Sequence, residues 1–145
     1  MSRDPRYDIL FEPVAIGPVT AHNRFFQVPH CNGMGHAMPN SVAAMRGMKA
    51  EGGWAVVATE ECDIHASSDV LPYKEARLWD DGDRDCLALM ADRVHEHGAL
   101  AAIELTHSGH NVSNRYSRLP VLGVSDSGVN SFDPVQACAM TKRDI

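Results

Sequence analysis

The chain of 145 residues is long enough for one domain, and its 44% hydrophobic and 22% charged residues are typical of a soluble globular protein. Thirteen Lys and Arg against nineteen Asp and Glu give a net charge of −6. No basic surplus is available to neutralise phosphates, so a nucleic-acid or anionic-membrane role is disfavoured. The apolar runs are too short to span a bilayer and no secretory segment opens the chain, which predicts a cytoplasmic protein.

A hairpin and three strands are expected along the chain. The hairpin spans residues 14–20 and turns at Gly17-Pro18. The strands are apolar runs without polar alternation, a pattern typical of parallel strands that are covered on both faces. They occupy residues 25–28, 54–58 and 100–105.

Two helices are expected between these strands. The first spans residues 41–51, with Ser41 as its N-cap and Gly52-Gly53 at its end. The second spans residues 83–97, with acidic residues at its start and basic residues in its last turn, an order that complements the helix dipole. Their apolar faces are expected at Val42, Met45 and Met48, and at Leu87, Met90, Ala91 and Val94.

This order of elements predicts an α/β fold, either a doubly wound sheet or the opening of a (β/α)8 barrel. No G-x-G-x-x-G motif follows a strand, which argues against a dinucleotide-binding unit. Residues 106–145, rich in Ser, Asn, Gly and Pro, predict an irregular excursion. The four cysteines form no C-x-x-C pair, so no local zinc or iron–sulfur site is expected and all four are expected to be thiols.

Polar residues gather where the expected strands end, the edge at which parallel α/β folds place their chemistry. Cys31 follows the first strand and is either a reactive thiol or an inert, half-buried cysteine. Glu60 and Glu61 follow the second strand. They either point to opposite faces, so that one enters the mouth, or are solvated loop acids.

The third strand contains a carboxylate, Glu104, within an otherwise apolar run. A buried carboxylate requires a hydrogen-bond donor, so a ligand N–H or an arginine is expected beside it. His107 and His110 follow this strand, but no third ligand stands at a recognisable spacing. No metal site is therefore predicted.

Several motifs resemble the Old Yellow Enzyme family of flavin-dependent (β/α)8-barrel oxidoreductases. They are Leu10-Phe11-Glu12-Pro13, Ile16-Gly17-Pro18, Asn23-Arg24-Phe25 and Glu104-Leu105-x-His107-x-Gly109. Other segments are similar to the branch that contains the trimethylamine, dimethylamine and histamine dehydrogenases: Gln27-Val28-Pro29-His30-Cys31, Lys49-Ala50-Glu51-Gly52-Gly53-Trp54-Ala55 and Trp79-Asp80-x-Gly82-Asp83.

The resemblance covers residues 1–145 and implies the N-terminal portion of an FMN-binding TIM-barrel domain. The expected structure is the first three βα units of an incomplete (β/α)8 barrel, preceded by the short hairpin. A complete barrel takes about 250 residues. The rest of the barrel, the 4Fe-4S site and the dinucleotide-binding domain would lie outside this chain.

The resemblance also implies a role for particular residues. Cys31 would carry FMN through a covalent thioether to C6, with Pro29 and His30 along the isoalloxazine and Thr59 near the ring. Glu104 would accept a hydrogen bond from flavin N3–H. Glu61 and Thr106 would line the substrate pocket. Glu61 replaces an aromatic residue of the trimethylamine-oxidising members, which favours a bifunctional amine.

The implied activity is that of an amine dehydrogenase, which oxidises a C–N bond to an imine that hydrolyses to an aldehyde. Electrons would pass through the 4Fe-4S cluster to an acceptor protein, and the full-length enzyme would be a homodimer. No catalytic residue is assigned within this chain. Two alternatives remain open: an ene- or dienoyl-CoA reductase that uses NAD(P)H, and a truncated fragment without catalytic activity.

Overall fold

A parallel sheet forms the centre of the computed structural model, which describes residues 4–69, 74–129 and 133–145. Strand β4 (Val56–Asp63) lies in the middle, with β6 (Leu100–Thr106) along one side. On its other side β4 pairs first with β3 (Phe26–Gln27) and then, at its carboxyl end, with β5 (Ala76–Arg77). The expected strands are confirmed, and β4 extends five residues beyond the predicted end at residue 58 because it continues through the acidic segment.

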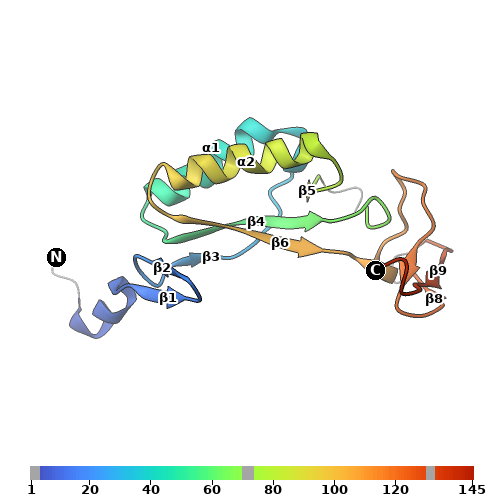
Figure 1. Ribbon diagram of the computed structural model, residues 1–145, viewed down its shortest axis with the longest axis horizontal. Helices are drawn as coiled ribbons and strands as arrows, with labels where there is room; N and C mark the ends of the chain where they lie inside the picture. Colours follow the sequence, from blue (N-terminus) through green and yellow to red (C-terminus); the bar gives the residue numbers. More distant parts are fainter. Residues whose placement is uncertain (1–3, 70–73, 130–132) are drawn as a thin grey trace.

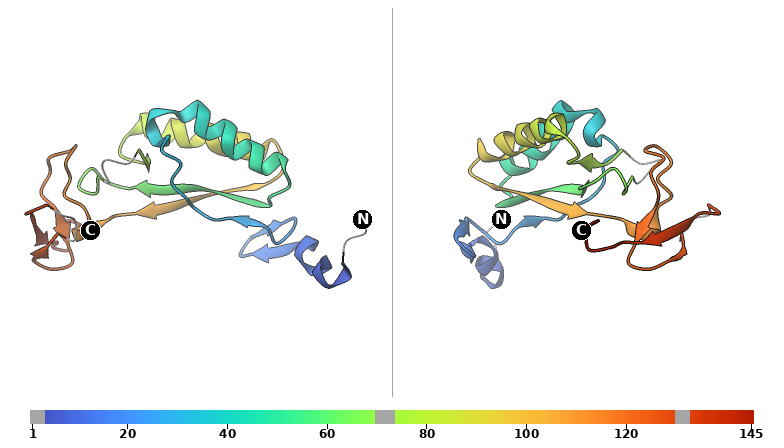
Figure 2. Two further views of the ribbon diagram at one scale, coloured as in Figure 1. Left: turned by 180° about the vertical axis from the view of Figure 1, so that it is seen from behind. Right: turned by 45° about the vertical axis from the view of Figure 1, so that its right-hand side comes forward.

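Helices α1 (Pro39–Glu51) and α2 (Asp81–His95) lie side by side on one face of this sheet (Figures 1 and 2). Both crossovers therefore use the same face, and β3, β4 and β6 are neighbours in chain order. This is how a (β/α)8 barrel begins. The expectation that the sheet is covered on both faces is wrong for the described residues, because helices cover one face alone.

Small side chains allow the close packing of α1 against α2. The buried face of α1 is made by Ala43, Arg46, Gly47 and Ala50, whereas Met48, expected on the buried face, is 63% exposed. A Cβ atom on Gly47 would lie 3.3 Å from Cβ of Arg93 on α2. The apolar face expected on α2 is confirmed at Met90 and Val94, which join Val57 of β4 in the core.

The helix ends follow local sequence signals in part. Asp80 caps α2 by accepting a hydrogen bond from the backbone N–H of Asp83 at 3.0 Å. Helix α1 begins two residues before the expected Ser41 cap, because Pro39 occupies its first turn, where a missing N–H costs nothing. The predicted end of α1 at Gly52 is confirmed.

The predicted hairpin is present as β1 (Val14–Ile16) and β2 (Val19–Ala21), joined at Gly17 with φ of +56°. It follows a 3-10 helix, η1 (Pro5–Phe11), and lies across the sheet from the helices (Figure 1). A second small core joins the hairpin to the starts of the central strands. Its members are Val14, Ala21, Ala55, Val56, Leu100 and Ala102.

The segment after β6 holds more regular structure than the sequence predicted. It contains the 3-10 helix η3 (Gly109–Asn111) and a small sheet in the order β7-β9-β8. Strand β7 spans Leu122–Gly123, β8 spans Ser127–Gly128 and β9 spans Gln136–Ala139. The described residues thus supply two complete βα units and a third strand, which is followed by this excursion and by no third barrel helix. No helix in the described part of the chain is long and apolar enough to span a membrane.

Candidate functional site at the carboxyl end of the sheet

A β-bulge in β4 determines which of the two adjacent glutamates faces the helices. The pairing of β4 with β6 is regular up to Ala58 and resumes at Glu61, which lies opposite Glu104. Thr59 and Glu60 fall between these points and share one position of β6, as in a β-bulge. The bulge turns Glu60 toward the helix-covered side, where it is 1% exposed, while Glu61 is exposed on the open face.

The open face therefore carries several of the residues that the sequence placed at the site. Glu61 and Glu104 are directly opposed in register, and Thr106 follows two residues later on the same face of β6. Glu104 lies inside its strand as expected, but it is exposed, because no helix or strand of the described residues covers the open face near the strand ends. The two carboxylates stand ready to accept hydrogen bonds from a molecule placed over this face.

Thr59 has a different placement. Its side chain is 2% exposed, and its hydroxyl donates to the carbonyl oxygen of Glu60 and accepts from the backbone N–H of Glu104 at 3.2 Å. The hydroxyl thus joins β4 to β6 across the bulge. A direct contact between Thr59 and a flavin ring stays a prediction.

Cys31 lies on the loop between β3 and α1, and its thiol is exposed. Strand β3 ends at Gln27, two residues before Pro29, which is half-buried, and His30 is exposed. The loop continues into η2 (Gly35–Ala37), where a Cβ atom on Gly35 would clash with the backbone of Glu75. The same Glu75 carbonyl accepts from the backbone N–H of His36 at 3.1 Å. The cysteine loop is thereby fixed against the segment that enters β5.

Glu75 is a site residue that sequence reasoning missed. It precedes β5 and is 9% exposed, and burial together with the charge of Glu61 and a hydrogen bond between the two side chains raises the pKa of Glu75 to about 7. Burial, and then the charges of Glu75 and Glu60, also raise the pKa of the Cys31 thiol, while a hydrogen bond from the Gly33 backbone lowers it. A carboxyl pair, Glu61 and Glu75, therefore lies beside the cysteine.

The histidine that follows β6 is engaged within the protein. His107 Nδ1 accepts from the backbone N–H of Gly109 at 3.2 Å, so its Nε2–H donates to Ser67 Oγ at 2.9 Å. The Ser67 hydroxyl then donates to His65 Nδ1 at 2.8 Å. Burial, and next the nearby His65, lower the pKa of His107. Within the described residues, no group of three or more His, Cys, Asp or Glu side chains is arranged to hold a metal ion.

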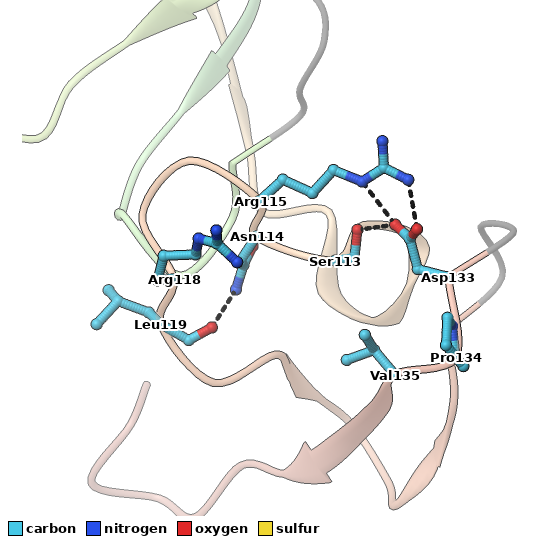
Figure 3. A pocket seen from close by; sticks show the side chains of 8 residues that line it. All are labelled: Ser113, Asn114, Arg115, Arg118, Leu119, Asp133, Pro134 and Val135. Carbon is cyan, nitrogen blue, oxygen red and sulfur yellow. Dashed lines mark hydrogen bonds and ion pairs between the residues drawn. The ribbon is translucent and has the colours of Figure 1, made fainter.

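A separate pocket lies in the excursion after β6 (Figure 3). Arg115 extends toward Asp133 and donates from Nε to its Oδ2 at 2.8 Å, and Ser113 donates to the same carboxylate. Asn114 lies at the edge of the pocket and is buried, with its amide donating to the Ser67 carbonyl at 2.8 Å. None of the residues expected at the site lines this pocket, so the carboxyl edge of the sheet remains the candidate site.

A scan against protein families matches residues 9–145 to the model of the NADH:flavin oxidoreductase / NADH oxidase family. The chain is 47% identical over 138 residues to dimethylamine dehydrogenase from Hyphomicrobium sp. (strain x). That match covers 95% of this chain and 19% of the relative.

Two solved structures extend this similarity to the fold. Histamine dehydrogenase from Rhizobium sp. 4-9 superposes with a TM-score of 0.93 at 51% identity, over 98% of this chain and 22% of that protein. The 6-hydroxypseudooxynicotine amine oxidase from Pseudomonas geniculata N1 gives a TM-score of 0.92 at 43% identity, over 99% of this chain and 22% of that protein. The chain thus spans about one fifth of the length of these relatives, and the predicted incomplete (β/α)8 barrel is confirmed.

Proposed function

The chain belongs to the NADH:flavin oxidoreductase / NADH oxidase family, and from this premise we propose that it is the N-terminal part of an FMN-dependent amine dehydrogenase. The observation that carries the proposal is the exposed thiol of Cys31, at the carboxyl edge of the sheet beside Glu61 and Glu75. The 47% and 51% identities to enzymes named for dimethylamine and histamine support it.

The residues at this edge fit a flavin in chemical type. Cys31 supplies an exposed sulfur for a thioether to C6 of FMN, with Pro29 and His30 on the adjoining loop. Glu104, exposed on the open face, supplies the acceptor that the N3–H of the isoalloxazine requires. Thr59 supports this arrangement through the Glu104 backbone N–H, which its hydroxyl oxygen binds.

When bound, FMN supplies an acceptor for the two electrons that leave the carbon attached to the amine nitrogen. The imine product then takes up water to give an aldehyde and a smaller amine. The part played by this chain is to hold the cofactor through Cys31 and Glu104 and to shape the substrate pocket with Glu61 and Thr106. The groups that move protons in the reaction lie outside this proposal.

The carboxyl pair of Glu61 and Glu75 indicates the class of substrate. The pKa of Glu75 is raised by burial and then by the charge of Glu61, and a positively charged group near the two side chains would offset the repulsion between them. Coulomb attraction at 4 Å amounts to about 4 kcal/mol at an effective dielectric of about 20, before desolvation is subtracted. The nitrogen that is oxidised must itself be neutral to release electrons. A bifunctional amine, with a second cationic or donor group for Glu61, fits better than trimethylamine.

Further parts of the proposal concern the whole protein. A 4Fe-4S cluster would receive the electrons and pass them to an external acceptor protein. The full-length enzyme would be a cytoplasmic homodimer, with neither nucleic acid nor membrane as a partner. These statements are supported by the family resemblance and by the similarity to the amine dehydrogenases.

The test is anaerobic reduction of the flavin in the full-length enzyme. Histamine and a diamine should bleach the flavin absorbance without added nicotinamide cofactor, and dimethylamine serves as a third substrate. If NADPH bleaches the flavin and an enone or a dienoyl-CoA restores it, while no amine has an effect, the protein is an ene reductase. If no flavin binds at all, the chain belongs to a protein without this catalytic function.

A further inference from the structure

A buried arginine holds the peptide group on one side of Cys31. Arg46 of α1 is 0% exposed, and its guanidinium donates from Nη2 to the carbonyl oxygen of His30 at 2.9 Å. Its Nη1 donates to Oε1 of Gln27 at 2.8 Å, so the two bonds span the end of β3 and the start of the loop. This forked geometry is one that a guanidinium provides and an ammonium does not.

A buried carboxylate holds the peptide group on the other side. Glu60 is 1% exposed, and its Oε2 accepts from the backbone N–H of Asn32 at 3.0 Å. Burial raises the pKa of Glu60, while the Asn32 hydrogen bond and the charge of Arg46 lower it. The bulge in β4 is what directs this side chain toward the loop and away from the open face.

The two bonds bracket one residue. Arg46 fixes the carbonyl before Cys31 and Glu60 fixes the N–H after it, and the two opposite charges attract each other across the segment. A charged side chain that is fully buried is costly unless it is bonded and lies near an opposite charge. The cysteine loop supplies hydrogen-bond partners for Arg46 Nη2 and Glu60 Oε2, and the two side chains supply opposite charges, whereas Arg46 Nε and Glu60 Oε1 have no hydrogen-bond partner among the described residues. The backbone of an exposed loop is thus held from the protein interior on both sides of Cys31.

We propose that Arg46 and Glu60 are positioning residues for the attachment of FMN to Cys31. The inference rests on the proposed function, because it requires that Cys31 carries the flavin. Attachment joins Cys31 Sγ to C6 of FMN, and the thiol hydrogen and the C6 hydrogen leave as protons. The two electrons released pass, with these protons, to dioxygen, which becomes hydrogen peroxide. The sulfur must be held in line with C6 for this bond to form.

The experiment adds FMN to the flavin-free, full-length enzyme and follows two quantities. One is the total FMN bound, and the other is the rate at which flavin becomes resistant to removal by denaturant. Arg46→Met should slow attachment by about 10- to 100-fold, because a displacement of the sulfur by about 1 Å is enough for such a loss. The dissociation constant for FMN before attachment should stay within about twofold of wild type, since Glu104 is untouched.

Conservative variants separate positioning from general damage to the fold. Arg46→Lys keeps the charge and loses the fork, so it should still attach FMN slowly. Glu60→Gln keeps an oxygen that can accept from Asn32, so it should attach faster than Glu60→Leu. The matched control is Glu51→Leu, an exposed position at the end of α1, which should behave as wild type.

Each outcome has a defined meaning. If wild-type enzyme attaches FMN while Arg46→Lys and Glu60→Leu attach it at the same rate, the positioning role is excluded and the proposed function stands. If the wild-type enzyme attaches no FMN, both the tether and this inference fail. A variant that loses total FMN binding and attachment in equal measure also contradicts a positioning role.

Discussion

The two faces of β4 differ sharply at its carboxyl end. On the helix-covered face, Glu60 and Arg46 are fully buried and bind defined backbone groups of the cysteine loop. On the open face, Glu61 and Glu104 are exposed and opposed in register. Strand alternation places these two consecutive glutamates on opposite sides, and the bulge at Thr59 and Glu60 decides that Glu60 takes the helix-covered side.

The difference shows that adjacent residues of the same type can serve unrelated purposes. The carboxylate of Glu60 has a structural role, because it accepts a hydrogen bond from the Asn32 backbone and lies near the positive charge of Arg46. The carboxylate of Glu61 meets Glu75, a second acid, so a cationic ligand group would relieve the repulsion within this pair. We therefore expect substitutions on the covered face to change stability and loop position, and those on the open face to change ligand binding.

The largest expected effect on stability lies on the covered face. Met90→Ala removes a side chain that is 1% exposed and packs against Val57 and Val94, so it should lower the free energy of unfolding by about 2–5 kcal/mol. Met48→Ala is the matched control at a 63% exposed position, with an expected change within about 0.5 kcal/mol. Urea unfolding of the full-length protein measures both. If Met90→Ala and Met48→Ala lowered the free energy of unfolding equally, the packing of Met90 in the core would be contradicted.

The next effect concerns the open face. Glu61→Gln in the full-length enzyme should lower kcat/KM for histamine and a diamine by an amount worth about 1–3 kcal/mol, since a hydrogen bond to a charged group is lost. The value for trimethylamine should stay near wild type, because that substrate has no second group for Glu61. The measurement is kcat/KM of wild type and Glu61→Gln for each of the three amines. A uniform change across all three would take Glu61 out of substrate selection.

Glu75 predicts a pH dependence with a defined sign. Its pKa is raised from the ordinary 4.5 to about 7 in the folded chain, so between these pH values the folded state holds a proton that the unfolded state releases. Stability from this group is therefore present below pH 4.5 and declines as the pH rises toward 7. Glu75→Gln should flatten that decline in unfolding free energy, with Glu51→Gln as control. If the unfolding free energies of wild type and Glu75→Gln changed in parallel with pH, the pKa of Glu75 would not be raised in the folded chain.

The smallest effect concerns the thiol. The pKa of Cys31 is raised first by burial and then by Glu75 and Glu60. Glu75→Gln removes one of these charges, so alkylation of Cys31 by iodoacetamide in the flavin-free enzyme at pH 8 should become several-fold faster. Mass spectrometry of the peptide that contains Cys31 separates it from the other cysteines. An unchanged or slower rate would place the carboxyl pair too far from the sulfur to matter.

Local chemistry explains what the sequence predicted well. Gly17-Pro18 specifies the hairpin turn, and the acidic start of α2 together with the apolar spacing of Met90 and Val94 specifies that helix. The strands follow from continuous apolar runs between the helices. The edge at which Cys31, Glu61 and Glu104 gather also follows, because parallel strands bring their carboxyl ends to one side of a sheet.

The remaining features depend on contacts between distant segments. An arginine within a helix is normally solvated, so Arg46 gave no sign that it would be buried beneath the cysteine loop. Glu75 lies in a loop far from β4 along the chain and reaches Glu61 through the pairing of β5 with the end of β4. The bulge at Thr59 and Glu60 interrupts the alternation on which strand predictions depend. The prediction for α1 is confirmed at Val42, which packs against the core, and is wrong at Met48, because small residues allow the closest helix contact.

The tether between Cys31 and FMN is tested most directly by denaturing and digesting the purified full-length enzyme and following the flavin. We expect the yellow colour to stay with the protein, and mass spectrometry to place FMN, less two hydrogens, on the peptide that contains Cys31. In Cys31→Ala the flavin should wash out on denaturation, although it binds the folded protein. A wild-type enzyme that releases all of its flavin in denaturant would show that Cys31 carries no covalent flavin.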